Sequence, residues 1–93
     1  MIRSFRDKRT AALFQGIVVK GTSVDLAERV RAKLLMLDAA VSVDDLRVPP
    51  GNRLEKLVGR RVGQHSIRVN DQWRLCFRWA SAGPENVELV DYH

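Results

Sequence analysis

The chain has 93 residues, of which 45% are hydrophobic and 29% are charged. This length leaves room for one domain with a modest core, so we expect a single domain over residues 1–93. No apolar run is long enough for a membrane-spanning helix, and the first residues of the chain do not resemble a signal peptide. The one cysteine has no second cysteine with which to form an internal disulfide. These features predict a globular protein of the cytoplasm that does not associate with a membrane.

The charge balance bears on the class of partner. Sixteen Lys and Arg residues outnumber eleven Asp and Glu residues, which gives a formal net charge of +5. An excess of this size in a small domain favours a polyanionic or an acidic partner. Many small proteins are basic for no specific reason, so the charge by itself leaves a nucleic-acid partner open.

The start of the chain predicts a short strand and a short helix. Ile2–Phe5 alternates apolar and polar residues, which favours a first strand at a sheet edge. Asp7 is a suitable cap for a helix over Lys8–Gln15. Ile17–Lys20 is flanked by two glycines, and we expect it to connect this helix to the next.

The most distinct helix is expected over Thr22–Ala40. Hydroxyl side chains at its start, with Asp25 three residues after Thr22, form a capping-box variant. Arg29, Arg31 and Lys33 are predicted to form a solvated face. The opposite, apolar stripe repeats at spacings of three and four residues and consists of Val24, Ala27, Val30, Leu34, Leu37 and Val41.

The second half of the chain predicts strands joined by short loops. Ser42–Leu46 can add one helical turn before Pro49–Gly51, which excludes helix. A strand is expected over Asn52–Val58, followed by a loop with two arginines that ends at Gly63. A last strand is expected over Asn86–Tyr92.

Between these strands, residues 63–79 predict a β-hairpin with two different faces. Asn70-Asp71 suits a tight turn between two runs of alternating side chains. Because alternation has a period of two, one face should enter the core and the other should be exposed. The expected core residues of the second run are Trp73, Leu75, Phe77 and Trp79, and the expected exposed face carries Arg68, Arg74 and Arg78. Short links between successive strands predict an antiparallel sheet with the helices on one face, an α+β fold.

The sequence contains residues for metal-independent RNA cleavage. It has no glycine-rich phosphate loop, no Cys/His cluster at metal spacing and no serine triad, so we expect neither a metal nor another cofactor. RNA cleavage without a metal needs a base for the 2′-hydroxyl, a cation for the phosphate and an acid for the leaving oxygen. Arg74 and the terminal Asp91, Tyr92 and His93 can supply these functions. The simpler interpretation is that the chain ends there and Tyr92 closes the core.

The pattern of motifs resembles a known family. Asn70–Phe77, followed by the terminal Val90–His93, resembles the HigB toxins of bacterial toxin–antitoxin modules, within the RelE/ParE superfamily. The match extends to Ile2–Phe5, Pro49–Leu54 and Gly63–Arg68, and it is nearest to the GraT-like branch. The resemblance therefore covers essentially the whole chain.

The resemblance implies a fold, an activity and partners. The fold would be RelE-like, with an N-terminal strand and two helices packed on one face of an antiparallel β-sheet. The activity would be that of a toxin that inhibits translation as a ribosome-dependent mRNA endonuclease, cutting RNA in the ribosomal A site without a metal. The partners would be the ribosome, mRNA and a HigA-type helix-turn-helix antitoxin, and the toxin would reach operator DNA only through that antitoxin.

The resemblance also implies site residues. By position, Arg74 corresponds to the sheet arginine that stabilises the phosphate, and Asp91, Tyr92 and His93 correspond to the C-terminal catalytic residues. Glu55 stands where some members of the family have a catalytic histidine. Glu55 would then act as the general base, or the chemistry would rest on Tyr92 and His93.

Other basic residues are candidates for contacts with RNA or the ribosome. Cationic contacts to phosphates need little sequence precision, and the candidates here are Lys56, Arg60, Arg61 and Arg68. The alternative is an ordinary solvated surface. Two other functions also remain open: a ParE-like toxin that inhibits DNA gyrase without cutting RNA, and a basic nucleic-acid-binding module without catalysis.

Overall fold

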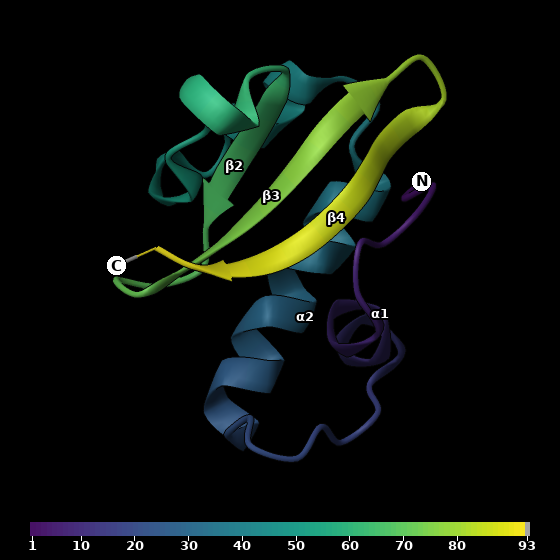
Figure 1. Ribbon diagram of the computed structural model, residues 1–93, viewed down its shortest axis with the longest axis vertical. Coiled ribbons are helices and arrows are strands. Elements are labelled where there is room, and N and C mark those ends of the chain that lie inside the picture. The colour runs from purple at the N-terminus through teal and green to yellow at the C-terminus, as the bar shows by residue number, and fades with distance from the viewer. Residues whose placement is uncertain (93) are drawn as a thin grey trace.

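A computed structural model describes residues 1–92 as an α+β domain (Figure 1). Its α-helices are α1 (Lys8–Gln15) and α2 (Val24–Ala39). Three short 3-10 helices come later in the chain: η1 (Val43–Arg47), η2 (Pro50–Asn52) and η3 (Gly59–Arg61). The strands are β1 (Glu55–Lys56), β2 (Gln64–Arg68), β3 (Trp73–Ala80) and β4 (Gly83–Asp91). The strands form one antiparallel sheet in the order β1-β2-β3-β4, so sequence neighbours are also neighbours in space.

Local capping explains the bounds of α1, which the sequence predicted. The Asp7 carboxylate accepts a hydrogen bond from the backbone N–H of Thr10 at 2.6 Å, so a donor at the open helix start is satisfied. The helix ends at Gly16, whose φ of 79° lies in the left-handed region that glycine adopts without strain.

Helix α2 is shorter than predicted. Ser23, not Thr22, is the N-cap, and its hydroxyl accepts from the N–H of Leu26 at 3.1 Å. Val24 and Val41, the two ends of the predicted apolar stripe, are 76% and 90% exposed. They lie at or beyond the ends of the helix, where the turn can no longer direct them to the sheet. The fully buried part of the stripe is its middle, Val30, Leu34 and Leu37.

The core lies between the two helices and one face of the sheet. Leu75 and Phe77 of β3 are fully buried there, and Trp73 and Trp79 pack at its margin, so the predicted core face is confirmed. Figure 1 shows α1 beside β4 and α2 crossing behind the sheet. Other strand residues in this core are Ile67, Val69, Val87 and Leu89.

The predicted first strand is reduced to a single bridge. Within Ile2–Phe5, only Phe5 pairs with the sheet, as a parallel bridge to Val87 of β4. The N–H of Val87 donates to the Ser4 carbonyl at 3.1 Å, and the N–H of Arg6 donates to the Val87 carbonyl at 2.9 Å. The segment therefore covers the outer edge of β4, although it is too short and bent to continue as a strand.

The strand expected over Asn52–Val58 is also much shorter, because its first residues are not in a strand conformation. Asn52 ends η2 and is fully buried, and Arg53 has a φ of 46° in the left-handed region. A residue with that φ does not continue a strand. Pairing with β2 begins only at Glu55 and ends at Lys56.

The second face of the sheet is less exposed than the alternation predicted. Ser66 and Cys76 on this face are fully buried, and Arg74 is only 7% exposed, whereas Arg78 is exposed as expected. The small side chains lie among long charged neighbours, which cover them. The alternation correctly assigned the residues to this face, but it could not show that the face is partly closed.

Residues 1–92 include no helix that is both long and apolar enough to cross a membrane.

Candidate active site

Strand register brings the chemically active side chains onto one face of the sheet. Glu55 of β1 pairs with Ser66 of β2, and Ser66 pairs with Cys76 of β3. Arg68 of β2 pairs directly with Arg74 of β3. Side chains of paired residues point to the same face and lie about 5 Å apart at Cβ. Glu55, Arg68 and Arg74 therefore share the face opposite the helices.

Arg74 is fixed by hydrogen bonds before any ligand arrives. Its Nε donates to the Ser66 hydroxyl at 2.8 Å, and its Nη2 donates to the carbonyls of Arg53 at 2.7 Å and Ser66 at 3.3 Å. Among the residues that the structure describes, Nη1 makes no hydrogen bond, so its two N–H groups remain available. Charged N–H groups on a guanidinium nitrogen held in this way suit the oxygens of a phosphate.

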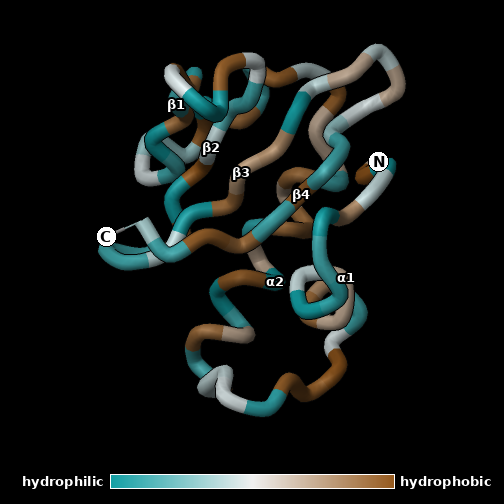
Figure 2. The backbone as a smooth tube through the Cα atoms, in the orientation of Figure 1, coloured by the Kyte–Doolittle hydropathy of each residue, from teal (hydrophilic) through white to brown (hydrophobic). Residues whose placement is uncertain are grey.

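Tyr92 closes one side of Arg74. Its N–H donates to the Gln72 carbonyl at 2.8 Å, which extends the pairing of β4 past its last residue. The Arg74 Cζ atom lies 5.4 Å from the centre of the Tyr92 ring, a cation–π contact. Tyr92 is 46% exposed and lines the depression described below. In Figures 1 and 2 the end of β4 lies beside the hydrophilic turn between β2 and β3.

These residues line one open depression of about 530 Å³. Its cations are Arg53, Arg68 and Arg74, against the carboxylates of Glu55 and Asp71. The Arg68 guanidinium pairs with the Asp71 carboxylate, which is 98% exposed. Directly opposed arginines repel one another, so the depression favours an anionic ligand. The remaining lining residues are Gly51, Asn70 and Tyr92.

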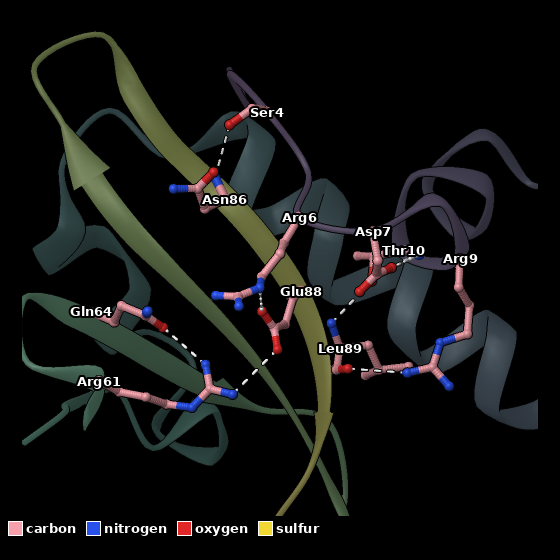
Figure 3. Close-up of polar contacts among 10 residues, drawn as sticks. All are labelled: Ser4, Arg6, Asp7, Arg9, Thr10, Arg61, Gln64, Asn86, Glu88 and Leu89. Carbon is pink, nitrogen blue, oxygen red and sulfur yellow. Dashed lines mark hydrogen bonds and ion pairs between the residues drawn. The ribbon is translucent and has the colours of Figure 1, made fainter. Parts of the chain in front are cut away.

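Four predicted site residues lie outside this depression. Lys56 pairs with His65 and so projects to the opposite face of the sheet. Arg60 is exposed on η3, and Arg61 pairs with Glu88 at 3.3 Å, next to Arg6 (Figure 3). Asp91 accepts a hydrogen bond from Gln72 at 3.0 Å. His93 lies outside the described residues.

The sequence analysis did not single out Ser66, which holds Arg74, or Asn70 and Arg53, which line the depression. Ser66 lies two residues before Arg68 in the same alternating run, and this spacing was a signal that Ser66 shares the face of Arg68. Asn70 was assigned only to a turn, where its carboxamide oxygen does accept from the N–H groups of Gln72 and Trp73 at 2.9 and 2.8 Å. Arg53 gave no local signal, because its carbonyl reaches Arg74 only through the left-handed turn that follows η2.

Two other titratable side chains have perturbed environments. Burial raises the pKa of the Cys76 thiol, so this side chain stays neutral on the charged face. Burial, with smaller effects of Lys56 and Arg47, lowers the pKa of His65, whose ring stacks on Phe77. In the described part of the chain, no three His, Cys, Asp or Glu side chains gather into a group that could hold a metal ion.

Comparison with known proteins identifies the family. Residues 3–93 match the model of the HigB-like toxins, described as RelE-like toxins of the type II toxin–antitoxin system HigB. The chain belongs to this family. The resemblance inferred from the sequence is thereby confirmed, and with it an antitoxin as the kind of partner that defines these systems.

Individual HigB relatives differ in how much of them this chain matches. Toxin HigB-1 of Vibrio cholerae is 53% identical over 57 residues, a stretch that covers 61% of this chain and 60% of that protein. Endoribonuclease HigB of Proteus vulgaris is 30% identical over 93 residues, which is 100% of both chains.

A solved structure confirms the RelE-like fold of this HigB-like chain. A chain of the YoeB–YefM complex from Staphylococcus aureus superposes with a TM-score of 0.64 over 100% of this chain and 98% of that one. The two sequences are 14% identical, so the likeness concerns the fold alone.

Proposed function

We propose that this toxin is a metal-independent endoribonuclease that cuts mRNA in the ribosomal A site and so inhibits translation. The observation that carries the proposal is the depression that contains Arg74, Tyr92 and Glu55. It offers a fixed cation, a phenol and a carboxylate on one face of the sheet, which are the residue types that this chemistry needs. The full-length relative from Proteus vulgaris, named an endoribonuclease, supports the same activity.

The proposed reaction is an internal phosphoryl transfer. The 2′-oxygen attacks the adjacent phosphorus, its proton passes to a base, and a P–O2′ bond forms. The P–O5′ bond breaks, and an acid gives a proton to the departing 5′-oxygen. The products are a 2′,3′-cyclic phosphate and a 5′-hydroxyl, so no water or metal is consumed in the step.

Arg74 has the role of stabilising charge on the phosphate oxygens as the reaction proceeds. Its bonds to Ser66 and Arg53 hold the guanidinium still, so little reorganisation is needed when charge develops. The Nη1 nitrogen is the part that contacts the phosphate. Arg68 adds a second positive charge from the neighbouring strand.

Proton transfer is assigned to Glu55, Tyr92 and His93. Glu55 is exposed and lines the depression, and it is assigned the role of general base for the 2′-hydroxyl. Tyr92 is placed against Arg74 and can exchange a proton on the other side. His93 directly follows Tyr92 in the sequence, and Asp91 supports the terminal segment through Gln72.

The proposal includes the cellular setting. The toxin acts in the cytoplasm, on ribosomes that carry mRNA, and a HigA-type helix-turn-helix antitoxin neutralises it. Through that antitoxin it takes part in repression at operator DNA. Membership of a toxin–antitoxin family supports the antitoxin, and the basic charge supports a substrate made of RNA.

Primer extension on a reporter mRNA in a purified translation system tests the proposal. We expect cuts within A-site codons that require both the toxin and ribosomes, and that disappear when purified antitoxin is added. Absence of cuts, together with growth arrest in cells and inhibition of gyrase supercoiling, would replace the nuclease with the ParE-like alternative.

A further inference from the structure

A second basic depression adjoins the candidate active site. It has a volume of about 280 Å³ and lies between α2 and the sheet, where Arg29 and Lys33 of the helix face Arg68 of β2. Gly51 and Arg68 line both depressions, so the two lie side by side. The sequence had assigned Arg29 and Lys33 to a solvated face.

Lys33 is held in place by a buried amide. Asn52 is fully buried, and its carboxamide oxygen accepts from the Lys33 Nζ atom at 2.5 Å. The amide nitrogen of Asn52 donates to the carbonyls of Leu46 at 3.2 Å and Val48 at 3.4 Å. These bonds fix the orientation of the amide, and the amide fixes the ammonium. An ammonium has three donors, so Lys33 keeps two for a ligand.

The charges in this depression are unbalanced. Its described lining contains the three cations and no carboxylate. Burial and the positive charge of Arg68 both lower the pKa of Lys33. Arg29 and Arg68 have carboxylate partners, Asp25 and Asp71, but these are 81% and 98% exposed, on the solvent side. An anion between Lys33 and Arg68 would relieve their repulsion.

We propose that Lys33 and Arg68, with Arg29 at the rim, bind a phosphodiester of the RNA backbone next to the phosphate that Arg74 contacts. The inference rests on the proposed nuclease function, because it assigns this depression to the same ligand. Arg68 and Arg74 are paired across adjacent strands. Phosphates bound at the two places are therefore close enough to belong to one RNA strand, or to an mRNA and a ribosomal RNA that meet there.

Lys33→Gln separates this role from a structural one. The glutamine amide can still donate to Asn52, but it has no charge. The matched control is Lys20→Gln, because Lys20 is exposed in the connection between α1 and α2, at the end of the molecule away from the sheet (Figure 1). Arg68→Gln is a second variant on the opposite wall, and thermal unfolding shows which proteins are folded.

Fluorescence anisotropy with a short 2′-O-methyl RNA, which cannot be cleaved, measures the binding at several salt concentrations. We expect Lys33→Gln and Arg68→Gln to bind severalfold more weakly than the wild type, with Lys20→Gln unchanged. Each lost phosphate contact should reduce the slope of log K against log salt by about 0.7. A second arm measures binding to mRNA-programmed ribosomes, and an effect confined to that arm would assign the phosphate to ribosomal RNA.

Unchanged affinity and slope for folded Lys33→Gln in both arms would overturn the subsite. A different result would contradict the nuclease proposal. If the wild type cuts no RNA and yet its affinity for the oligonucleotide depends on Lys33, the subsite stands and the proposed catalysis does not.

Discussion

At the scale of single residues, the site depends on how Arg74 is held. A guanidinium that is 7% exposed and bonded on two of its nitrogens loses little freedom when it contacts a phosphate. The side chains that fix it, Ser66 and Tyr92, come from a neighbouring strand and from the chain end. Residue types were therefore enough to nominate Arg74, but its partners became visible only in three dimensions.

Arg74→Lys should abolish most of the RNA cleavage without unfolding the protein. Lysine keeps the charge, but it cannot bond Ser66 and Arg53 while presenting a planar edge to the phosphate. Loss of one stabilising donor typically lowers kcat by about 100-fold or more, and we expect that reduction in a single-turnover assay. Arg78→Lys, on the same strand but exposed, is the control. Similar rates for both variants would remove Arg74 from the mechanism.

His65 should make the fold sensitive to mild acid. Its pKa is lowered in the folded protein, so above about pH 6.5 the imidazole is neutral in both the folded and unfolded states. As the pH falls through that value, the unfolded chain takes up the proton first and unfolding becomes more favourable. We therefore expect Tm to fall between pH 7 and pH 5 by an amount that His65→Phe reduces. Phenylalanine can keep the ring contact with Phe77. Identical pH profiles for the two proteins would contradict this account.

At the scale of elements, α1 and the N-terminal segment protect the edge of β4. An uncovered edge strand exposes backbone groups that can pair with other chains. Here the N–H of Leu89 donates to the Thr10 hydroxyl at 3.0 Å, and Arg9 donates to the Leu89 carbonyl at 3.1 Å (Figure 3). The same edge carries the contacts of Ser4 and Arg6. The outer strand is thus held by elements from the other end of the chain.

Thr10→Val should destabilise the protein by about 1–3 kcal/mol. Valine has nearly the same shape as threonine, but it leaves the buried N–H of Leu89 without an acceptor, and such unpaired donors are costly. Chemical denaturation monitored by circular dichroism measures the change in the free energy of unfolding. Thr22→Val, at a half-buried loop position, should change it much less. Equal effects would show that the Thr10 bond contributes little.

At the scale of the whole molecule, the limits of sequence-based prediction follow the range of the contacts. The bounds of α1 and the turn at Asn70 depend on residues within a few positions, and the sequence predicted both. The bridge between Phe5 and Val87 joins distant segments, so alternation overestimated the first strand. The partial closure of the Arg74 face also depends on a distant turn, at Arg53.

Also at the scale of the whole molecule, one variant should separate toxicity from assembly with the antitoxin. Arg74 is almost enclosed, so Arg74→Lys leaves the outer surface of the molecule nearly unchanged. We expect this variant to co-purify with the antitoxin as well as the wild type does, while it no longer arrests growth. Loss of co-purification by a folded Arg74→Lys protein would place this residue at the antitoxin interface instead.

The most direct test of the central claim uses one altered nucleotide. Programmed ribosomes would carry an mRNA with either ribose or 2′-deoxyribose at the nucleotide before the scissile bond in the A site. Attack by the 2′-oxygen predicts that the wild type cuts the ribose substrate, leaves a 2′,3′-cyclic phosphate and does not cut the deoxy substrate. Equal cleavage of the two substrates would contradict the proposed chemistry at Arg74.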